Sequence, residues 1–91
     1  MAQRPIYRLD EKHMMAVLLY LYENGPSNLT SIYGATSKNF NMPKKLDTLV
    51  ELGLLTSSAV SVHETYVDLT KRGRYIAEHL ALIEEALGNQ F

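Results

Sequence analysis

The chain has 91 residues, a net charge of −1 at pH 7 and no cysteine. A chain of this length buries roughly 60 to 65% of its unfolded surface, so we interpret residues 1–91 as a single domain. Without cysteine, disulfides, thiolate metal sites and cysteine nucleophiles are excluded. The longest apolar run, Met14 to Tyr22, has nine residues, and a membrane span needs about 20. We therefore expect a cytoplasmic protein with no membrane contact.

The first helix is predicted over about residues 10–24. Asp10 is placed as its N-cap, and Gly25 followed by Pro26 is typical of a helix end. Apolar residues occupy more than one side of this helix, which predicts that it is covered on more than one side. Residues 1–9 are interpreted as an N-terminal arm.

A short second helix is predicted over about residues 29–35, capped by Ser27 or Asn28. The third helix is predicted over about residues 38–52, with Ser37 or Asn41 as its cap. Helical spacing gives it an inward face of Met42, Leu46, Leu49, Val50 and Gly53. The opposite face, which is free to contact a partner, holds Asn41, Lys44, Thr48 and Glu51.

After the third helix the pattern changes to two short extended runs, residues 54–57 and 62–69, joined through residues 58–61. Alternation of apolar and polar residues in the second run favours a β-hairpin. Thr70 is predicted to cap a last helix that runs to about Leu87 and stops at Gly88. The predicted fold class is mostly α with a small β-hairpin.

Three segments carry a family resemblance: LTSIY at residues 29–33, KLDTLVELGLL at 45–55 and YVDLTKRG at 66–73. They resemble small archaeal winged-helix regulators and chromatin proteins, and more loosely the multiple-antibiotic-resistance and arsenic-type repressors. The resemblance implies a winged helix-turn-helix fold that binds double-stranded DNA as a homodimer. It also implies that the third helix enters the major groove and that residues 70–88 form a dimerisation helix. The expected wing, residues 57–63, contains no lysine or arginine, whereas wings of this family often insert one into the minor groove.

The basic residues fall into three groups along the chain. These groups are Arg4, Arg8 and Lys12; Lys38, Lys44 and Lys45; and Lys71, Arg72 and Arg74. Such segregation can give a neutral protein one basic face. The alternative is charge scattered over a solvated surface.

The third helix supplies most of the candidate DNA-binding residues: Ser37, Lys38, Asn39, Asn41, Lys44, Lys45 and Thr48. An asparagine can pair with adenine, a lysine with guanine, and a threonine methyl with thymine. The alternative is that Asn41 only caps the helix and Lys44 is only solvated. Lys71, Arg72 and Arg74 begin the last helix, where basic charge costs a few tenths of a kcal/mol per residue against the helix dipole. That cost favours a role in phosphate binding.

The last helix also carries a candidate dimerisation surface, formed by Tyr75, Ile76, Leu80, Leu82, Ile83 and Leu87. Four of these residues have the spacing of a coiled-coil seam. One side of the helix can then serve the core of the domain and the other a second subunit. The alternative is that both sides belong to the intramolecular core.

No catalytic motif supports an enzyme. His13, His63 and His79 are isolated, and the chain has no phosphate-binding loop or nucleophile motif. We therefore expect no catalytic residue, metal or cofactor. The sequence predicts a homodimeric, nucleoid-associated DNA-binding protein that regulates transcription. The alternatives are a winged-helix protein-interaction module, which a pI near 6.3 keeps open, and an architectural chromatin protein.

Overall fold

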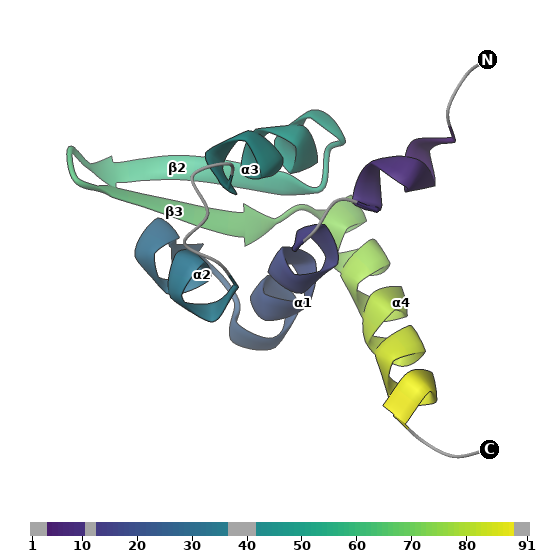
Figure 1. Cartoon of the computed structure of the whole chain (residues 1–91). Helices are drawn as coiled ribbons and strands as arrows, with labels where there is room; N and C mark the ends of the chain where they lie inside the picture. The colour runs from purple at the N-terminus through teal and green to yellow at the C-terminus, as the bar shows by residue number, and fades with distance from the viewer. Residues whose placement is uncertain (1–3, 11–12, 37–41, 89–91) are drawn as a thin grey trace.

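The computed structural model describes residues 4–10, 13–36 and 42–88. A 3-10 helix, η1, precedes the first α-helix, and the remaining elements form a small helical domain with a hairpin and a long last helix. The elements are η1 (Pro5–Leu9), α1 (Met14–Asn24), β1 (Ser27–Asn28), α2 (Leu29–Ala35), α3 (Met42–Glu51), β2 (Leu55–Ser61), β3 (Glu64–Leu69) and α4 (Lys71–Gly88). Figure 1 shows α1, α2 and α3 grouped around the hairpin, while α4 runs away from it. The predicted fold class is confirmed.

A single apolar core joins these elements. Helix α1 contributes Met14, Val17, Leu18 and Leu21, the positions expected for one face of a helix. Helix α3 contributes Met42, Leu46 and Leu49, as predicted, but Val50 is 41% exposed and its predicted inward position is wrong. On a helical wheel Val50 lies at the edge of the buried face that Met42 and Leu49 form. At this edge it lines a small cavity beside the hairpin.

The predicted start of the first helix is wrong. Helix α1 begins at Met14, and His13 before it has a left-handed backbone with φ of 72°. Asp10 instead ends η1, where its N–H donates to the Tyr7 carbonyl at 3.1 Å. Leu9 of η1 enters the core, with 8% of its surface exposed. Part of the segment interpreted as an arm is therefore packed against the domain.

The sheet has three antiparallel strands in the order β1-β3-β2. Strand β1 was not predicted because its two residues are too few to show alternation. Strand β2 is longer than predicted and includes residues 58–61, because pairing with β3 at Ser58↔Tyr66 and Ala59↔Thr65 overrides the weak strand preference of serine and alanine. The hairpin therefore turns at Val62 and His63.

The structure identifies the N-cap residues of α2 and α4. The Ser31 N–H donates to Asn28 Oδ1 at 2.8 Å, so Asn28 caps α2. The Gly73 N–H donates to Thr70 Oγ1 at 2.9 Å, so Thr70 caps α4 as predicted. The two candidate caps of α3, Ser37 and Asn41, lie outside the described residues.

The start of α4 is attached directly to the chain that leaves α3. Thr70 Oγ1 donates to the Gly53 carbonyl at 2.5 Å, and the Thr70 N–H donates to the Leu54 carbonyl at 3.0 Å. Gly53 itself has φ of 78°, a conformation that favours glycine. These contacts fix the first turn of α4 beside the C-terminal end of α3.

Candidate nucleic-acid interface

The outward face of α3 is open in the described part of the helix. Lys44 is exposed, whereas Lys45 and Thr48 are half-buried. Thr48 Oγ1 donates to the Lys44 carbonyl at 3.1 Å, so its hydroxyl hydrogen is used within the helix. The threonine can still present a lone pair and its methyl group to a base. Ser37, Lys38, Asn39 and Asn41, the other candidates on this segment, lie outside the described residues.

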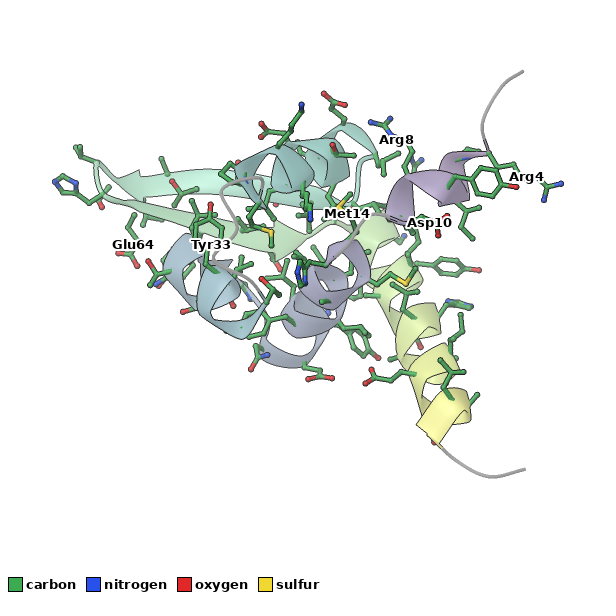
Figure 2. The ribbon with its side chains drawn as sticks, viewed as in Figure 1. Arg4, Arg8, Asp10, Met14, Tyr33 and Glu64 are labelled. Carbon is green, nitrogen blue, oxygen red and sulfur yellow. The ribbon has the colours of Figure 1, made fainter. Side chains whose placement is uncertain are left out.

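The charge of α3 changes along its length. Lys44 and Lys45 stand in the N-terminal half, and Asp47 and Glu51 stand further along. Glu51 forms an ion pair with Arg8 of η1 at 3.4 Å between Oε2 and Nη2, and Figure 2 shows Arg8 between η1 and α3. The N-terminal half is therefore the more positive half, and it is the part of a recognition helix that reaches base edges.

The three basic residues at the start of α4 are all exposed, but they do not form one cluster. Arg72 lines an apolar groove of about 410 Å³, which is otherwise formed by Pro5, Ile6, Leu9, Leu52, Leu54 and Ile76. Lys71 and Arg74 are three residues apart and so share a different face of the helix. A common phosphate-binding role is thus better supported for Lys71 and Arg74 than for Arg72.

The basic N-terminal half of α3 and the basic start of α4 lie at opposite ends of α3. Helix α3 has 10 residues, which corresponds to about 15 Å. Because Thr70 is bonded to Gly53 at the C-terminal end of α3, Lys71 and Arg74 stand at the opposite end from Lys44.

The outer face of the hairpin is acidic. Side chains alternate along β3, so Glu64, Tyr66 and Asp68 share the face that turns away from the core residues Val67 and Leu69. The neighbouring Glu64 carboxylate raises the pKa of Tyr66 above its ordinary value, as a hydrogen-bond acceptor for the neutral phenol and by its negative charge, with a smaller contribution from burial. Sequence reasoning noted that the wing has no basic residue but missed this acidic face, which the alternation at residues 64–68 could have shown.

The predicted dimerisation residues of α4 divide into two sets. Ile76 and Leu80 are partly buried against the core. In contrast, Tyr75 is 64% exposed, Leu82 56%, Ile83 55% and Leu87 83%. The continuous seam expected from the sequence is therefore shared, with its first half packed on the domain and its second half open in the single chain.

Other kinds of site find no support in the described residues. Within residues 4–10, 13–36 and 42–88, no group of three histidine, aspartate or glutamate side chains could hold a metal ion. The helices in this same part of the chain are all too short or too polar to cross a membrane.

Three helices, a paired hairpin whose turn projects beyond them, and an exposed face on the third helix define a winged helix-turn-helix. Similarity to solved structures confirms this fold. An archaeal protein, reported as a mechanosensitive channel and described as a structural homologue of MarR-like transcriptional regulators, is 18% identical with a TM-score of 0.71, covering 96% of this chain and 80% of its own. Reduced AbfR bound to DNA is 21% identical with a TM-score of 0.59, covering 92% of this chain and 81% of its own. No family model and no curated protein matches the sequence.

Proposed function

We propose that this chain is a homodimeric DNA-binding protein that regulates transcription from the nucleoid, with α3 in the major groove. The observation that carries the proposal is the open outer face of α3, with exposed Lys44 on its more positive half, in a fold shared with AbfR, whose structure contains DNA. The ten proposed DNA contacts are Ser37, Lys38, Asn39, Asn41, Lys44, Lys45, Thr48, Lys71, Arg72 and Arg74.

The position of the proposed phosphate contacts supports this mode of binding. Lys71 and Arg74 stand at one end of α3 and Lys44 and Lys45 towards the other. A helix lying in the groove would then have cations at both of its ends, and their contacts to phosphates would fix its register without reading sequence. The acidic outer face of the hairpin would be repelled by phosphate, so we assign no DNA contact to β3.

The proposed dimer rests on the exposed apolar side chains of α4. Four large apolar side chains, Tyr75, Leu82, Ile83 and Leu87, are each more than half exposed on one helix. Leu82, Ile83 and Leu87 lie close together in the second half of the helix, and exposed apolar side chains gathered in this way mark an interaction site. If two copies of α4 packed against each other about a twofold axis, each copy would cover the exposed apolar side chains of the other.

The proposal predicts a steep dependence of DNA affinity on salt. A protein that neutralises several phosphates releases their counterions, and the logarithm of the affinity falls with the logarithm of salt by about 0.9 per contact. Fluorescence anisotropy with a labelled duplex at several salt concentrations measures this slope. A flat slope, or no binding at low salt, would instead favour the alternative of a winged-helix module that contacts another protein.

Lys44 and the Lys71/Arg74 pair are expected to act differently on DNA. Replacing Lys44 by alanine should cost about 1 to 3 kcal/mol at a preferred site, if the side chain reads a base, and little on random duplexes. Replacing Lys71 and Arg74 together should weaken binding to every sequence and reduce the salt slope by about two.

Binding selection from a random duplex library, followed by anisotropy on the selected and scrambled sites, separates these effects. Glu78→Gln is a matched control, because it removes one exposed charge from the same helix beyond its first turn. Equal losses on both duplexes for Lys44→Ala would make Lys44 a backbone contact. Equal affinity of both duplexes for the native protein would favour the architectural role over the site-specific one.

A further inference from the structure

Strand β2 is a free sheet edge. It stands at the end of the sheet order β1-β3-β2, so one side of its backbone has no partner strand within the described residues. All six residues from Thr56 to Ser61 are exposed. Natural edge strands are often shielded by lysine, proline, inward-pointing charge or a β-bulge. The sequence of β2, LTSSAVS, contains no such residue, and its register irregularity lies near the hairpin tip, between Ala59 and Ser61.

The same strand is compatible with itself in an antiparallel arrangement. If two copies pair about Ser58, the opposed residues are Ser58 with Ser58, Ser57 with Ala59, and Thr56 with Val60. All are small or β-branched and uncharged, so no like charges meet. The irregularity between Ala59 and Ser61 could shift the axis to Ser57, and Thr56 would then oppose Ser58, which is equally neutral.

The charge around β2 favours a second copy of this chain, over nucleic acid or a basic segment, as the partner of this edge. The β2 edge is neutral, and the strand behind it carries Glu64 and Asp68 on its outer face, so phosphate would be repelled. A neutral, self-complementary strand fits its own twofold copy, in which each surface meets the same surface. Val60, which is 60% exposed, would stand opposite Thr56 and lose water in such a pair.

We propose that β2 pairs with β2 of a second copy and joins the two sheets into one across a twofold axis. This contact goes beyond the dimer proposed through α4 and uses a different surface. Two different twofold contacts on one chain produce an open row of molecules, so adjacent dimers would assemble side by side. The contact is small, and it should form only at high protein concentration or where DNA holds dimers close together.

Charged substitutions on β2 test this contact. The starting protein is the full chain with Ile83→Asp, which disrupts the proposed α4 contact, studied by sedimentation over a wide concentration range without DNA. Pairing should appear at high concentration. Thr56→Lys with Ser58→Lys should weaken it about tenfold, because like charges then face each other in either register. Thr56→Glu with Ser58→Glu should do the same, and an equal mixture of the two variants should restore pairing.

Matched controls keep this test decisive. Ser31→Lys with Ala35→Lys adds the same charge to exposed positions of α2 and should leave pairing unchanged. If the glutamate variant fails to fold because position 56 faces Asp68, amide exchange over residues 56–60 replaces it and should slow as concentration rises in the starting protein. A starting protein that stays monomeric at every concentration, or a lysine variant that pairs as tightly as its parent, overturns the proposal.

Discussion

Replacing Gly73 by alanine is expected to lower the free energy of unfolding by about 3 kcal/mol or more. Gly73 is buried in the first turn of α4, and a Cβ built there would lie 2.0 Å from the Leu54 carbonyl oxygen and 2.9 Å from its carbon. The obstacle is backbone, which no rotamer change can move. It also belongs to the segment that Thr70 binds, so α4 would have to detach from the end of α3.

Thermal denaturation at matched protein concentration measures this loss. A small domain has about 5 to 15 kcal/mol of stability in all, and 3 kcal/mol corresponds to a fall in Tm of at least about 12 °C. Gly34→Ala is the matched control, since nothing lies within 4 Å of the added carbon and alanine favours the helix by about 0.5 to 1 kcal/mol. An unchanged Tm for Gly73→Ala would mean that α4 is not seated on Leu54 in solution.

The fold could be predicted from the sequence where the signal is local. The spacing of Met14, Val17, Leu18 and Leu21, and the Thr70 cap, needed only helix geometry. The Asp10 cap failed because Asp10 closes η1, whose Leu9 enters the core, and α1 begins only after His13, which has a left-handed backbone; the burial of Leu9 is a tertiary constraint. The tight contact of Gly73 was equally invisible, because nothing near residue 73 in the sequence indicates that Leu54 lies against it.

The candidate site is less predictable, because it depends on which side chains the fold brings together. Charge grouping placed Lys71, Arg72 and Arg74 in one set, and the structure separates Arg72 into an apolar groove beside η1. The ion pair between Arg8 and Glu51 joins residues 43 apart, so no periodic pattern could indicate it. Strand β2 has a free edge because of the strand order β1-β3-β2. The two extended runs predicted from the sequence do not specify that order.

Ile83→Asp is expected to weaken the proposed α4 dimer at least about 100-fold. Ile83 is 55% exposed in the single chain, so the domain should tolerate the change and its Tm as a monomer should stay nearly constant. In a twofold interface the substitution acts twice, because each copy places a carboxylate against the apolar face of the other. A buried charge without a partner costs several kcal/mol, and about 2.7 kcal/mol already corresponds to 100-fold.

Sedimentation at low concentration measures the change, since the small β2 contact cannot hold a pair at that dilution. Glu85→Asp is the matched control: it places the same side chain about 160° around the helix and should leave the dimer intact. The monomer should also lose DNA affinity, because a dimer links two heads and can place its recognition helices in successive major grooves about 34 Å apart. Two results would exclude the exposed apolar side chains of α4 as the dimer interface: a native protein that is monomeric, or an Ile83→Asp protein that stays dimeric and binds DNA normally. These four side chains would then be left to contact another partner.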